Sequence, residues 1–126
     1  MTEAEAFKAF EGMWGDGEYL VTFSYEDPEG TMDVLIEKDE ADGTLSIWDY
    51  PACWYDEKEG ALICAGVERR RVCVDPETYE TAELDWSLDD MQVALFILSE
   101  DGETLVGNEI AGLESDLALK RITTWK

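Results

Sequence analysis

Apolar and polar residues alternate with a period of two through most of this chain, a pattern typical of strands that bury one face. The alternation is clearest at Tyr19–Tyr25, Met32–Ile36 and Leu45–Trp48. Acidic turns with Pro or Gly separate such segments, as at Asp27-Pro28-Glu29-Gly30 and Asp56-Glu57-Lys58-Glu59-Gly60. Turn chemistry of this kind connects neighbouring strands as hairpins.

The N-terminal residues follow a helical pattern instead. Thr2-Glu3-Ala4-Glu5 has the form of a capping box, and Phe7, Phe10 and Met13 recur at helical spacing. A short amphipathic helix is therefore expected, ending at Gly12.

Further apolar segments predict more strands along the rest of the chain. They cover residues 52–55, 61–65, 67–74, 83–88, 93–98, 104–108 and 117–125. Short strands at regular spacing with hairpin connections favour an antiparallel meander. We predict one all-β domain over residues 1–126, an antiparallel up-and-down β-barrel of eight or nine strands with a short N-terminal helix, because closure removes exposed edges. A two-sheet sandwich is the alternative.

Charge and composition restrict the function. The chain has 31 acidic and 9 basic residues, no histidine and a formal charge of −22. A field of that sign repels nucleic acids and anionic membranes, so neither nucleic-acid binding nor membrane insertion is expected. The commonest general base and metal ligand is missing, and no nucleophile–base motif or phosphate loop occurs. We therefore expect a protein that is not an enzyme and that uses no metal or cofactor.

Gly12-Met13-Trp14 follows the predicted helix and begins the first strand. It resembles the Gly-x-Trp signature of lipocalins and related calycin barrels. The hairpin Tyr55-Asp56-Glu57-Lys58-Glu59-Gly60-Ala61-Leu62 is also similar to one in small lipocalin-like domains of bacterial proteins of unknown function. The resemblance implies that Trp14 closes one end of the barrel, with a basic side chain of the last strand over its indole. Arg121 is the expected partner, since a guanidinium stacks on indole and donates to carbonyl groups.

Arg69-Arg70-Arg71 is the only basic cluster. On a strand, Arg69 and Arg71 share one face and Arg70 takes the other, so at least one arginine could point into the barrel and hold a ligand carboxylate. Aromatic side chains would then surround the ligand's apolar part, and the candidates are Trp48, Trp54 and Phe96. The alternative is that the arginines face outward and pair with acidic side chains on neighbouring strands.

Cys53 and Cys64 flank the predicted hairpin loop. In one strand register they lie opposite each other and could form a disulfide, whereas a register shift of one residue would place them on opposite faces. The alternative is that they are small buried thiols. Asp39–Gly43 is acidic but lacks the ligand pattern of a calcium loop, so it is interpreted as a turn.

Two functions remain open. The first is a non-enzymatic binding module that holds a small apolar or amphipathic ligand inside the barrel. The second is an acidic protein-interaction domain, an inhibitor or nucleic-acid mimic with a filled barrel, whose partner would be a basic protein. The protein could be a monomer or a homodimer. As written the chain has no signal peptide and is expected to be cytoplasmic, or secreted or surface-anchored if it is a mature form.

Overall fold

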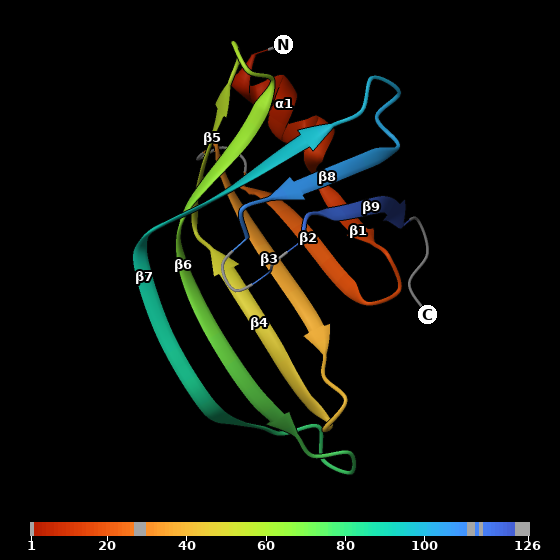
Figure 1. The fold of residues 1–126 in the computed structure, drawn as a ribbon, viewed down its shortest axis with the longest axis vertical. Coiled ribbons are helices and arrows are strands. Elements are labelled where there is room, and N and C mark those ends of the chain that lie inside the picture. The colour runs from red at the N-terminus through yellow and green to blue at the C-terminus, as the bar shows by residue number, and fades with distance from the viewer. Residues whose placement is uncertain (1, 27–29, 111–112, 114, 123–126) are drawn as a thin grey trace.

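A computed structural model describes residues 2–26, 30–110, 113 and 115–122, without the side chains of residues 26 and 89–91. Within this part the chain forms helix α1 and nine strands (Figure 1). Their bounds are α1 (Glu3–Phe10), β1 (Gly12–Gly15), β2 (Tyr19–Glu26), β3 (Thr31–Asp39), β4 (Thr44–Tyr50), β5 (Ala52–Asp56), β6 (Ala61–Val74), β7 (Thr81–Leu98), β8 (Thr104–Asn108) and β9 (Leu117–Ile122).

Eight of these strands close an antiparallel up-and-down barrel, which confirms the predicted fold class. The strands follow one another around the ring in chain order, β1-β2-β3-β4-β6-β7-β8-β9. The ring closes because β9 pairs with β1, Arg121 lying opposite Trp14. Strand β5 pairs only with the first part of β6, whereas β4 pairs with the second part, so Pro51 marks the point where the chain changes partners along β6.

One half of the barrel is filled by side chains. Its core contains Trp14, Phe23, Leu62, Phe96 and other apolar residues with at most 1 % of their surface exposed. Helix α1 packs against this half, as Figure 1 shows beside β2 and β5. The predicted capping box begins the helix: the Glu5 N–H donates to Thr2 Oγ1, and the Thr2 N–H donates to Glu5 Oε1.

The other half consists of the long strands alone. Strands β3, β4, β6 and β7 extend well beyond β1, β8 and β9 toward the lower end of Figure 1. We expected separate strands at residues 61–65 and 67–74, and again at 83–88 and 93–98, but each pair is one continuous strand, β6 and β7. A register shift between Ala65 and Val67 accommodates Gly66, whose φ is +73°, so the glycine bends the strand without ending it.

Two predicted features lie partly outside the described residues. The turn at residues 27–30 is described only at Gly30, and the closing strand, predicted to reach residue 125, is described to Ile122. The described helix is too short to cross a membrane.

Candidate functional site

A hollow of about 600 Å³ lies in the open half of the barrel, within the size range of small-molecule sites. Strands β4, β6 and β7 and the turn between β3 and β4 form its walls. Its lining includes Trp48, Arg69, Arg71, Asp85 and Ser87. Because Trp48 lies opposite Arg69 on β6, and Arg69 lies opposite Ser87 on β7, one row of inward-facing side chains crosses the three strands.

The three arginines of β6 differ in their surroundings. Arg70 lies opposite Ile47 and Trp86, and its Nε is 3.6 Å from the carboxylate of Glu68. Arg69 and Arg71 make no ion pair within the described part of the chain, although the chain has many more acidic than basic residues. All three arginines border the hollow, but they differ in their partners: Arg70 lies beside the Glu68 carboxylate, whereas Arg69 and Arg71 make no ion pair with the described residues.

Arg69 is held by aromatic contact instead of by a carboxylate. Its Cζ lies 5.6 Å from the centroid of the Trp48 ring, within the range of a cation–π interaction. Trp48 is only 4 % exposed, and its ring centroid lies 6.2 Å from that of Tyr19. The hollow thus has an aromatic wall with a cation at its edge, the combination that an amphipathic anion requires.

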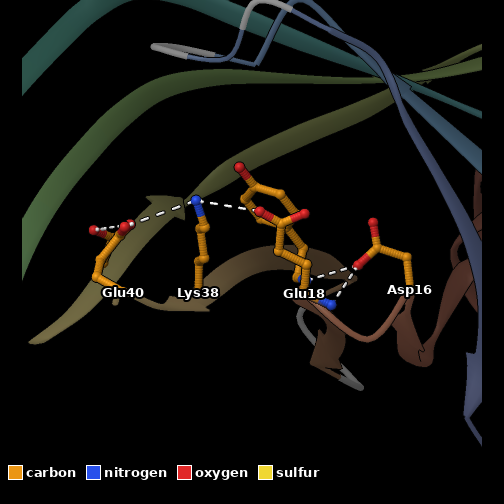
Figure 2. Close-up of polar contacts among 6 residues, drawn as sticks. Asp16, Glu18, Lys38 and Glu40 are labelled. Atoms are coloured by element: carbon orange, nitrogen blue, oxygen red, sulfur yellow. Dashed lines mark hydrogen bonds and ion pairs between the residues drawn. The ribbon is translucent and has the colours of Figure 1, made fainter. Parts of the chain in front are cut away.

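A second hollow of about 550 Å³ adjoins the first and shares Trp48, Arg69, Ser46 and Glu40 with it. Lys38 lines this second hollow, and Figure 2 shows its amine between the carboxylates of Glu18 and Glu40. The Nζ–Oε distances are 3.3 Å to Glu18 and 3.7 Å to Glu40. The hydrogen bond with Glu18 raises the pKa of Lys38, so this lysine stays charged but is already occupied by two carboxylates.

Glu18 is positioned by the turn before β2. In Figure 2 the carboxylate of Asp16 accepts hydrogen bonds from the N–H groups of Glu18 and Tyr19, at 2.8 Å and 2.7 Å. This turn holds Glu18 close to Lys38 and places Tyr19 where its ring meets both Trp48 and the Lys38 amine.

Two of the predicted ligand-contacting aromatics lie elsewhere. Phe96 is fully buried in the filled half of the barrel, where its ring packs edge-on against Phe23 at 5.1 Å. Trp54 lies on β5, is 43 % exposed and does not line the hollow. Phe96 and Trp54 therefore do not border this hollow beside Trp48, because hydrophobicity marks a side chain for burial without saying which part of the barrel is filled.

The helix end and the last strand meet at Trp14. The indole Nε1 donates to the Phe10 carbonyl at 2.9 Å, and the Arg121 Cζ lies 4.2 Å from the ring centroid. Arg121 also donates to the carbonyls of Ala9 at 2.8 Å and Glu11 at 3.0 Å. Gly12 has a φ of +120°, and a Cβ there would lie 3.3 Å from the Arg121 Nη1. The arrangement fixes the closed end of the barrel.

The two cysteines beside the hairpin are direct cross-strand partners. Cys53 on β5 lies opposite Cys64 on β6, and their sulfur atoms are 3.0 Å apart as free thiols. Burial raises the pKa of Cys64 well above its ordinary value, and the neighbouring Cys53 raises it further. Cys73, on the distant part of β6, is exposed. Of the two registers that the sequence left open, the structure has the one that faces the thiols toward each other.

Sequence reasoning missed Tyr19 and Lys38 as parts of the site. Tyr19 was interpreted only as a strand residue, and Lys38 lies near the end of β3 with no motif around it. Lys38 lies two residues after the buried Ile36 and therefore on the same face of β3. This spacing is the one sign in the sequence that the Lys38 side chain lies on the inner face. In the described part of the chain no three Cys, Asp or Glu side chains come together as a metal site.

Comparison with protein-family models, curated proteins and solved structures finds no match to this chain.

Proposed function

We propose that this protein is a non-enzymatic binding module for a small amphipathic ligand with an anionic group. The anionic group binds Arg69 and Arg71, and the apolar part lies against Trp48 and Tyr19. The observation that carries the proposal is the pair of arginines on the hollow that lack an ion-pair partner among the described residues. In a chain with a charge of −22, two guanidinium groups that make no ion pair with the described residues are a specific arrangement on one concave surface, even though the charge of Arg71 acts on the Asp42 carboxylate.

The ligand's chemistry follows from the lining. Three arginines and the carboxylates of Glu40, Asp42 and Asp85 border the first hollow, so a wholly apolar ligand would leave these groups desolvated without partners. A guanidinium binds a carboxylate through two parallel hydrogen bonds, which a neutral head group cannot replace. Lys38 and Arg70 contribute less, because each already lies beside a carboxylate.

We also infer that the chain is a lipocalin-like barrel. The closed antiparallel meander, Gly12-Met13-Trp14 at the head of β1 and the Arg121 guanidinium over the indole support this relationship. In this chain the region around Phe96 is filled, so the proposed ligand lies in the open half and not in a deep central cavity.

The proposal is tested by calorimetric titration with decanoate, using decanol as the neutral probe of equal chain length. We expect saturable binding of decanoate and binding of decanol weaker by at least about tenfold, the loss of one charge-assisted hydrogen-bonded pair. The variant Arg69→Gln/Arg71→Gln should lose about tenfold or more in decanoate affinity.

Arg70→Gln is the control because Arg70 also borders the hollow on the same strand but already lies beside the Glu68 carboxylate. We expect it to bind decanoate within about twofold of the unmodified protein. Equal losses in the Arg70 variant and the double variant would show a general charge effect, and the absence of saturable binding to either probe would contradict the proposal.

A further inference from the structure

The long part of β7 has a free edge. Strand β7 pairs with β6 from Thr81 to Ile97, but with β8 only from Leu95 to Leu98. Over residues 81–94 no described strand pairs with its other edge. In Figure 1 this segment forms the left margin of the molecule. A strand edge of this kind offers N–H and C=O groups that another chain can pair with.

Large apolar side chains follow the same segment. Leu84 is 51 % exposed, and Trp86 and Leu88 are each 53 % exposed. Trp86 is held at the surface by a hydrogen bond of 2.8 Å from its Nε1 to Glu68 Oε1. Because Leu84, Trp86 and Leu88 alternate along β7 with Asp85 and Ser87, which border the hollow, these apolar side chains lie on the outer face.

The charge around the edge selects its partner. Within residues 81–88 the only charged side chains are those of Glu83 and Asp85, which alternate with the exposed apolar residues, whereas the three arginines lie opposite on β6 and not at the free edge. The whole chain carries a charge of −22. Pairing with a second copy would bring two acidic edges together, and like charges directly opposite each other destabilise a strand pair. A nucleic acid would be repelled for the same reason.

We propose that residues 81–88 of β7 bind an extended segment of a basic protein by adding it to the sheet as a further strand. The backbone supplies hydrogen bonds along the free edge, and apolar side chains of the partner cover Trp86 and Leu88. Lysine or arginine residues alternating with them meet the carboxylates of Glu83 and Asp85 on the other face of β7. Asp85 also borders the hollow, but backbone pairing along the edge and apolar contact on the outer face require no bound ligand, so the inference does not rest on the proposed function.

The probe is a capped peptide of alternating lysine and valine residues, long enough to span residues 81–88. A second peptide of the same sequence carries N-methyl groups on the valines, which removes hydrogen-bond donors from one edge and keeps the charge. Titration calorimetry should show the first peptide binding at least about tenfold more tightly than the second. Hydrogen exchange should slow at backbone amides within residues 81–94 when the first peptide is bound.

Two substitutions in β7 separate edge pairing from general charge attraction. Leu88→Lys places a cation on the free edge, whereas Ile97→Lys makes the same charge change where β7 has partners on both sides, Ala61 and Val106. We expect Leu88→Lys to weaken peptide binding by about tenfold or more and Ile97→Lys to change it by less than about twofold.

Equal binding of the two peptides, equal effects of the two substitutions, or no binding at all would overturn the proposal. If Leu88→Lys failed to fold, as judged by circular dichroism, the peptide comparison and the exchange pattern of the unmodified protein would still decide it. Exchange protection outside residues 81–94 alone would also count against edge pairing.

Discussion

The guanidinium of Arg121 lies over the indole of Trp14, with its Cζ 4.2 Å from the ring centroid. This contact joins the last described strand to the first. Arg121 also accounts for two carbonyl groups at the end of α1, those of Ala9 and Glu11, which the helix itself leaves without partners. A cation at the C-terminal end of a helix is further favoured by the helix dipole.

We therefore predict that Arg121→Ala lowers the free energy of unfolding by about 1–2 kcal/mol, from the loss of charge-assisted hydrogen bonds and the cation–π contact. Arg121→Lys should give an intermediate value, because an amine cannot reproduce the planar, two-carbonyl geometry. Urea unfolding followed by circular dichroism measures both.

Lys120→Ala is the control, since Lys120 donates to Thr104 Oγ1 on the surface and not to the end of α1. Its effect should stay within about 0.5 kcal/mol. If Lys120→Ala were as destabilising as Arg121→Ala, Arg121 would stabilise the protein through its positive charge and not through its stacking and hydrogen bonds.

The cysteines should differ in reactivity. Cys73 is exposed, whereas Cys64 is buried with a pKa raised by desolvation, and the thiolate is the reactive form. Alkylation of the native protein with iodoacetamide should therefore modify Cys73 first and Cys64 last, as measured by peptide mass spectrometry. Rapid modification of Cys64 in the folded protein would be inconsistent with its burial.

The same structure predicts which disulfide can form. Cys53 and Cys64 face each other across paired strands, so incubation with oxidised glutathione should transfer two electrons from these thiols to it, giving the Cys53–Cys64 disulfide and reduced glutathione. A Cys73→Ser variant should form this bond equally well, and its melting temperature should rise on oxidation. A mass map that instead links Cys73 to either residue would contradict the register.

The ionised carboxylate of Asp49 should destabilise the native state at neutral pH. Burial raises its pKa, and the carboxylates of Asp33 and Glu68 raise it further, while Arg70 lowers it. The unfolded chain then releases this proton at a lower pH than the native state does, so stability falls as the pH rises through the interval between the two pKa values. Asp49→Asn should raise stability at neutral pH by about 0.5 kcal/mol, with no gain in acid where the carboxyl is protonated in both states.

Asp101→Asn is the control, because the pKa of Asp101 is shifted in the direction opposite to that of Asp49 and the substitution should change stability with the opposite sign. A hydrogen bond from Ser99, at 2.6 Å, lowers the pKa of Asp101, and the Glu103 N–H adds to this effect. Its contribution to stability is present above the pKa of the unfolded chain and is lost as the pH falls through the native value. Asp101→Asn should therefore lower the melting temperature at neutral pH. Shifts of the same sign in both variants would contradict this account.

Gly107 is required by packing. A Cβ at this position would lie 2.9 Å from Cε1 of Phe96, its cross-strand partner, and 3.1 Å from Cδ1 of Ile110. Since both neighbours belong to the core, Gly107→Ala should destabilise the protein by about 1–3 kcal/mol in urea unfolding.

Gly43→Ala separates this packing effect from backbone strain. Gly43 has a φ of +86°, and no atom lies within 4 Å of the position that a Cβ would occupy there. Alanine at this position therefore costs only its conformational strain, about 1 kcal/mol. A larger loss at Gly43 than at Gly107 would contradict the assignment of Phe96 to a tightly packed region.

Much of the fold follows from local pattern. The capping box at Thr2 and Glu5, the apolar spacing of Phe7 and Phe10, and the hairpin turns each act over a few neighbouring residues. A chain of hairpins places consecutive strands side by side, so the order of strands in the barrel could be predicted too. That Arg69 and Arg71 share one face of β6 follows from alternation alone.

The sequence by itself therefore determined the element types, the strand order and, between bulges, which side chains share a face. The register shift at Gly66 changes which residues of β6 face inward, from Leu62 and Cys64 to Val67. Only the tertiary structure decided that Phe96 is packed in the core while Trp48 lines a hollow, that Cys53 meets Cys64, and that β7 continues past β8 with a free edge. Alternation distinguishes two faces of a strand but cannot say how far each partner strand extends. Strand length and register are fixed by contacts between distant residues, and these decide where the barrel is filled and where it stays open.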